Sequence, residues 1–123
     1  MIFRMLSHEE QCLMINAAEH DLLPSVIWDW RADLDFGERL RRFPELAAAL
    51  IGLVDRGAIE VRRFAGGDDY EVVGRAGLEA VLADPAVWQY DDHTWIHRDR
   101  GLAIVETPAW HAGKRNAVPQ EDA

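Results

Sequence analysis

Apolar and polar positions over residues 8–22 follow the spacing of an amphipathic helix. Ser7 and Glu10 have the residue types of a capping box, in which each side chain accepts a hydrogen bond from the other residue's backbone N–H. The pattern predicts that this helix ends or kinks at Pro24. The next segment, SVIWDWR at 25–31, is short and apolar, and it fits either a further helical turn or a strand.

Two more helices are predicted before the middle of the chain. The first covers residues 36–43, and Pro44 suits the first turn of the second helix, PELAAALIGLVDR at 44–56. Gly57 then provides a helix stop. The apolar stripe of the second helix consists of Leu46, Leu50, Leu53 and Val54. The prediction for residues 7–57 is therefore three helices.

The spacing changes from helical to alternating after Gly57. Residues 58–64 alternate in the way that a strand does, GGDD at 66–69 is typical of a hairpin turn, and YEVV at 70–73 is the returning strand. These two strands are expected to pair antiparallel. A short helix is predicted near residues 75–83.

The C-terminal part differs in character because it is rich in tryptophan and histidine. HTWIH at 93–97 and LAIVE at 102–106 flank RDRG, and this pattern predicts a second hairpin. The polar segment 113–123 is expected to be a flexible tail. The whole predicts one α+β domain over residues 1–112.

The order of these elements resembles the winged helix-turn-helix superfamily. The resemblance is carried by LVDRGAIEV at 53–61, GGDD at 66–69 and YEVVGRAGL at 70–78, and it covers residues 7–83. The remainder is similar to small actinobacterial-type proteins with a winged-helix body. The resemblance implies a winged-helix-like three-helix core with an antiparallel wing hairpin, extended here by an extra short helix and a C-terminal hairpin.

The resemblance also implies a DNA-binding transcriptional regulator, whose helix before the wing would enter the major groove. That helix has, between Glu45 and Asp55, no Arg, Lys, Asn, Gln, Ser or Thr with which to donate a hydrogen bond to a base. The net charge of −9 further disfavours a nucleic-acid partner. DNA binding is therefore the alternative hypothesis, with backbone contacts expected from Arg39, Arg41, Arg42, Arg62 and Arg63.

The favoured hypothesis is a non-enzymatic protein that binds another protein. The helix over 44–56 is apolar on most sides, because alanines and Ile51 flank its leucine stripe, and such a helix is normally covered. The C-terminal hairpin or a second copy in a homodimer could cover it, and we favour the homodimer. A regulator or a basic toxin would suit the acidic surface. The expected contact residues are Ala48, Ile51, Trp95 and Trp110, of which Trp110 is expected to be the most exposed tryptophan.

The sequence predicts no cofactor, metal or catalytic site. On a strand, His93 and His97 would lie about 13 Å apart, too far to share one metal ion. Cys12 has His8 four residues before it but sits in an apolar run, so an inert buried thiol is expected. A metal- or ligand-sensing role of the His- and Trp-rich region is a third hypothesis. No apolar run approaches the length of a membrane helix, and we expect a cytoplasmic protein.

Overall fold

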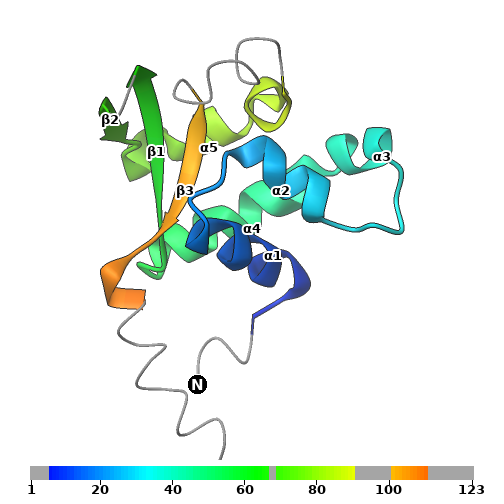
Figure 1. Cartoon of the computed structure of the whole chain (residues 1–123), viewed down its shortest axis with the longest axis horizontal. Coiled ribbons are helices and arrows are strands. Elements are labelled where there is room, and N and C mark those ends of the chain that lie inside the picture. The colour runs from blue at the N-terminus through cyan, green and yellow to red at the C-terminus, as the bar shows by residue number, and fades with distance from the viewer. Residues whose placement is uncertain (1–5, 67–68, 91–100, 111–123) are drawn as a thin grey trace, which may run out of the picture.

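The structure, a computed structural model, describes residues 6–66, 69–90 and 101–110 (Figure 1). Its elements are α1 (His8–Ala18), α2 (Leu23–Asp29), α3 (Phe36–Arg41), α4 (Phe43–Asp55), β1 (Ile59–Gly66), β2 (Asp69–Val72), α5 (Arg75–Leu82), the 3₁₀ helix η2 (Pro85–Trp88) and β3 (Leu102–Glu106). The predicted α+β class is confirmed. The three strands form one side of the molecule, and α3 lies at the end farthest from them (Figure 1).

The N-terminal helices differ from the prediction in number. The capping box is present, with Glu10 N–H donating to Ser7 Oγ at 3.1 Å and Ser7 N–H donating to Glu10 Oε1 at 2.8 Å. However, α1 ends at Ala18, and Pro24 lies in the first turn of α2 instead of ending α1. A proline in the first turn leaves no helical hydrogen bond unmade, because the first N–H groups of a helix have no partner within it. Residues 7–57 therefore contain four helices, and the prediction of three was wrong.

The predicted apolar stripe of α4 faces the core. Leu46, Leu50 and Leu53 are fully buried, and Val54 is half-buried against the same cluster. The helix packs against α1, α5 and β1. These elements of the same chain cover the leucine side of α4, whereas Ala48 is exposed.

The predicted antiparallel pairing of the two strands is confirmed. Strands β1 and β2 pair antiparallel, with Arg62 opposite Val72 and Phe64 opposite Tyr70. Gly57 links α4 to β1 with a φ of 75°, a conformation that side chains other than glycine rarely adopt. The sheet order is β2-β1-β3, so β1 is the central strand.

Strand β3 forms where LAIVE predicted a strand, and it joins the sheet beside β1. It pairs antiparallel with β1, and Val61 lies opposite Ile104. At its other edge, the Ile104 N–H donates to the carbonyl oxygen of Asp21 at 3.0 Å, and Leu22 forms an isolated bridge with Ala103. The apolar run 102–105 is buried throughout, and because successive side chains of a strand point to opposite faces, both faces of β3 are covered. HTWIH, the other half of the predicted hairpin, lies outside the described residues.

Two buried tryptophans anchor α2 and η2 in the core. Trp30, directly after α2, and Trp88, at the end of η2, are both fully buried. The Trp30 Nε1–H donates to Glu9 at 3.2 Å, and the Trp88 Nε1–H donates to the carbonyl oxygen of Leu82 at 3.0 Å. Both indole N–H groups thus have partners, as buried tryptophans require.

The burial of α4 generates a stability prediction. Because Leu50 is fully buried, Leu50→Ala should lower the free energy of unfolding by about 2–5 kcal/mol in a urea titration. Ile15→Ala is the matched control, since Ile15 on α1 is 63% exposed and its loss should change stability by less than about 0.5 kcal/mol. Equal effects of the two substitutions would contradict the packing described here.

Candidate functional site

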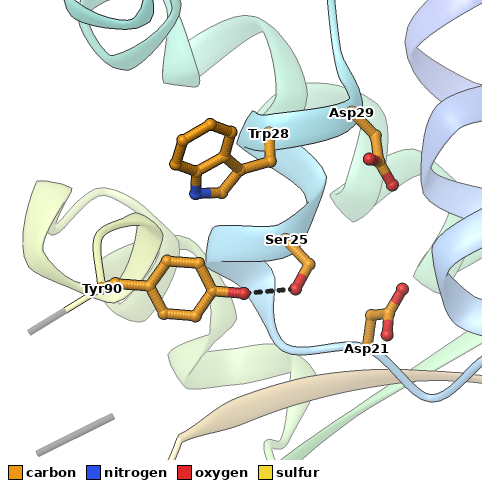
Figure 2. A pocket seen from close by; sticks show the side chains of 5 residues that line it. All are labelled: Asp21, Ser25, Trp28, Asp29 and Tyr90. Carbon is orange, nitrogen blue, oxygen red and sulfur yellow. Dashed lines mark hydrogen bonds between the residues drawn. The ribbon is translucent and has the colours of Figure 1, made fainter. Parts of the chain in front are cut away.

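An open pocket of about 580 Å³ lies beside α2. Its lining residues are Asp21, Ser25, Trp28, Asp29 and Tyr90 (Figure 2). In Figure 2 the rings of Trp28 and Tyr90 lie to one side of Ser25, and the carboxylates of Asp21 and Asp29 lie to the other. The pocket therefore combines an aromatic wall with an acidic wall.

The helical spacing of α2 places Ser25 beside two of these residues. Trp28 stands three residues and Asp29 four residues after Ser25, so each neighbours Ser25 on the helix surface, whereas the adjacent Trp28 and Asp29 diverge by about 100°. Tyr90 comes from the segment after η2. Its hydroxyl and that of Ser25 form a hydrogen bond of 2.6 Å across 65 residues of sequence. This bond joins the Tyr90 side chain to α2 (Figure 2).

Trp28 is the most exposed of the described tryptophans, with an exposed fraction of 58%. Trp30 follows two residues later, a rotation of about 200° around a helix, so the two rings point in opposite directions. The Trp28 ring packs against Phe36 of α3 with ring centroids 5.0 Å apart. Phe36 is itself 36% exposed. We call these two side chains the aromatic surface.

The position of the aromatic surface is fixed by Arg39 of α3. Its guanidinium donates hydrogen bonds to the carbonyl oxygens of Ile27 (3.3 Å), Trp28 (2.9 Å) and Leu34 (2.9 Å). The first two lie in the last turn of α2, where helix carbonyls lack intrahelical partners and favour a cation. Arg39, predicted as a nucleic-acid contact, thus holds α2 and α3 together.

The other four predicted nucleic-acid contacts face carboxylates of the same chain. Their ion pairs are Arg41–Glu38, Arg42–Glu45 at 2.7 Å, Arg62–Glu60 at 2.6 Å and Arg63–Glu71 at 3.9 Å. Adjacent residues of a strand point to opposite faces, so Arg62 and Arg63 of β1 do not share a surface. The guanidinium of Arg62 also lies 4.2 Å from the centre of the Tyr70 ring. The structure therefore does not gather these arginines into one cationic face.

The predicted partner-binding residues that the structure describes differ in their exposure to solvent. Ala48 is exposed on α4, whereas Ile51 is half-buried against the core. Trp110 is also half-buried and packs against the core cluster, so the expectation that it is the most exposed tryptophan was wrong. Trp95 lies outside the described residues. A helix assignment for SVIWDWR would have placed Trp28 and Trp30 on opposite sides of the helix. That assignment would have predicted one exposed tryptophan, which is Trp28.

The described residues that line the pocket carry hydroxyl, carboxylate and aromatic groups. The described residues that line it include no imidazole or amine that could act as a base for the Ser25 hydroxyl. Within residues 6–66, 69–90 and 101–110, no group of three or more His, Cys, Asp or Glu side chains is placed to hold a metal ion. No helix in these ranges is long and apolar enough to cross a membrane.

Comparison with known proteins adds no assignment. No protein-family model, no curated protein and no solved structure matches the chain. The functional conclusion therefore depends on the geometry and chemistry of the described residues.

Cys12 lies on α1, on the buried side of the helix. Burial, followed by the charges of Asp29 and Glu9, raises the pKa of its thiol from 9.0 to about 11. A thiol is nucleophilic only as the thiolate, so this environment keeps Cys12 inert.

The predicted inertness of Cys12 can be measured by thiol titration. At about pH 8 the folded chain should not react with Ellman's reagent on the time scale of minutes, because the thiol is both buried and protonated. The same chain in concentrated guanidinium chloride should react completely, which serves as the control. Full labelling of the folded chain would contradict the burial of α1.

Proposed function

We propose that this chain is a non-enzymatic, winged-helix-like domain that binds another protein through the surface formed by α2 and α3. The observation that carries the proposal is the exposure of Trp28 beside Phe36 at the edge of an open pocket. Exposed aromatic rings next to a concave site are typical of protein interfaces, where tryptophan is enriched among the residues that contribute most to affinity. Burying one such ring in a complex stabilises it by about 2 kcal/mol.

The order of elements supports the winged-helix-like part of the proposal. Helix α4 passes through Gly57 into the hairpin of β1 and β2, and α5 follows the hairpin. The chain departs from a minimal winged helix in β3, which comes from the C-terminal part and takes a place beside β1. The additional strand packs against α1, α2 and the connection between them, whereas α3 lies at the end of the molecule farthest from the strands (Figure 1).

The ion pairs of the arginines argue against the alternative of a DNA-binding transcriptional regulator. Binding to a phosphate backbone depends on cationic side chains that are available to replace counterions. Here four of the five candidate arginines face carboxylates, and the fifth, Arg39, bonds to backbone carbonyls. The net charge of −9 instead suits a basic protein partner, of a regulatory or toxin type.

The test of this proposal is affinity purification followed by binding measurements with the purified partner. Wild type and Ile15→Ala, which removes an exposed apolar side chain from α1, should bind the partner equally, with a Kd of about micromolar or tighter. Trp28→Ala should weaken binding at least about tenfold, because it removes the centre of the aromatic surface. Equal thermal melting of the three proteins controls for folding.

Two outcomes would contradict the proposal. One is the absence of any partner whose binding depends on Trp28. The other is tight, salt-dependent binding to a pool of genomic duplex fragments at about nanomolar concentration, weakened by Arg62→Ala or Arg63→Ala, which would establish the DNA-binding alternative.

A second copy of the chain is one of the partners that the proposal includes. Light scattering at micromolar concentration distinguishes the two places where copies could meet. A dimer that Trp28→Ala dissociates would have its interface on the aromatic surface. A dimer that Ile51→Glu dissociates would have its interface on α4, with Ala48 at its centre, and would contradict the surface proposed here.

A further inference from the structure

We infer that the pocket beside α2 binds the guanidinium group of an arginine side chain, placed between the Trp28 ring and the Asp29 carboxylate. This inference rests on the proposed function, because the arginine belongs to the protein that docks on the aromatic surface. It goes beyond that proposal by naming the chemical group that enters the pocket and the two residues that recognise it.

Asp29 gives the pocket a negative charge. Asp29 ends α2 and is exposed to solvent, and its carboxylate makes no ion pair or hydrogen bond with any described residue. Other aspartates differ in this respect, since Asp33 pairs with Arg31 at 2.9 Å and Asp55 pairs with Arg75 at 2.6 Å. The carbonyl oxygens of Ile27 and Trp28 in the last turn of α2 already accept hydrogen bonds from Arg39, so the negative charge open to a ligand is that of the Asp29 carboxylate. A cation entering the pocket therefore meets an acceptor with no other cation on it.

The aromatic wall of the pocket lies opposite the Asp29 carboxylate. Trp28 and Tyr90 present their rings on the other side of Ser25 from the carboxylate of Asp29 (Figure 2). A cation over an aromatic face is attracted by the electrons of the ring, and tryptophan is the strongest partner of this kind. The described residues that line the pocket include no lysine or arginine that would repel such a ligand.

The size and the chemistry of the pocket suit a guanidinium better than a metal ion or an ammonium. A volume of about 580 Å³ is far larger than a single metal ion requires, and a divalent ion would need more oxygen ligands in closer array. The guanidinium is planar and delocalised, so it can stack on a ring while its N–H groups bond a carboxylate. A lysine ammonium is a compact, strongly hydrated charge that cannot do both in the same way.

The pocket is also held in shape before any ligand arrives. The hydrogen bond of 2.6 Å between Ser25 and Tyr90 holds the Tyr90 ring beside α2. Arg39 holds the backbone of Trp28 through the 2.9 Å bond to its carbonyl oxygen. Preorganisation of this kind lowers the entropy that binding must lose.

The test uses N-acetyl-arginine methylamide as the probe, with the citrulline compound as its neutral counterpart of nearly equal shape. The ¹⁵N–H resonance of the Trp28 indole, assigned with Trp28→Phe, should shift on titration with the arginine probe, with a Kd of about millimolar. The citrulline and lysine compounds should bind at least about tenfold more weakly, because the first lacks the charge and the second lacks the planar donor group.

Variants identify the residues responsible. Asp29→Asn should weaken the arginine probe by at least about fivefold, because it removes the facing charge and keeps the shape. Glu79→Gln is the matched control, since it removes one exposed carboxylate from α5 and should leave the affinity unchanged. Ser25→Ala, which removes the bond to Tyr90, should also weaken the probe.

The outcomes separate this inference from the proposed function. Equal binding of the arginine and citrulline compounds, or no effect of Asp29→Asn, would overturn the inference, even where a protein partner depends on Trp28. Binding of the arginine probe as expected, with no protein partner that depends on Trp28, would support the pocket chemistry and overturn the proposed function.

Discussion

The hydrogen bond from the Ile104 N–H to the Asp21 carbonyl oxygen, 3.0 Å long, connects the C-terminal strand to the start of α2. The opposite edge of β3 pairs with β1, so this strand links the sheet to the N-terminal helices. Because the chain runs directly from Asp21 through Leu22 into α2, the register of β3 fixes where α2 begins. The positions of the pocket residues on that helix follow from this connection.

Two buried tryptophan rings fix the positions of the two chain segments that line the pocket. Trp30 inserts into the core directly after α2, and Trp88 does so two residues before Tyr90. With these rings held inside, Trp28 has to face outward, and Tyr90 is brought within hydrogen-bond distance of Ser25. The pocket is thus built on a rigid core and not on a long loop, which suits selective binding of a partner.

Local features of the fold could be predicted from the sequence, and non-local ones could not. The capping box at Ser7 and the leucine stripe of α4 depend on residues three or four apart, and both are present. The partner of β3 and the bond between Ser25 and Tyr90 depend on residues far apart in sequence, for which one chain gives no periodic pattern. The sequence pattern placed Pro24 at the end of the first helix. Its actual place in the first turn of α2 follows from the early end of α1 at Ala18, which the pattern did not show. The carboxylate partners of Arg41, Arg42 and Arg62 stand only two or three residues away, so the sequence already contained them. The bonds of Arg39 to the carbonyl oxygens of α2 depend on how α3 packs, which the sequence pattern does not give.

Native-state hydrogen exchange of the Ile104 amide tests most directly whether β3 holds α2 and the pocket in place. If it does, this amide should exchange only through global unfolding, with the same free energy of opening as the amide of Leu50 in the buried helix α4. The free energy should fall equally for both amides as urea is added. An Ile104 amide that exchanges through a local opening, at a free energy several kcal/mol below that of Leu50, would contradict the account.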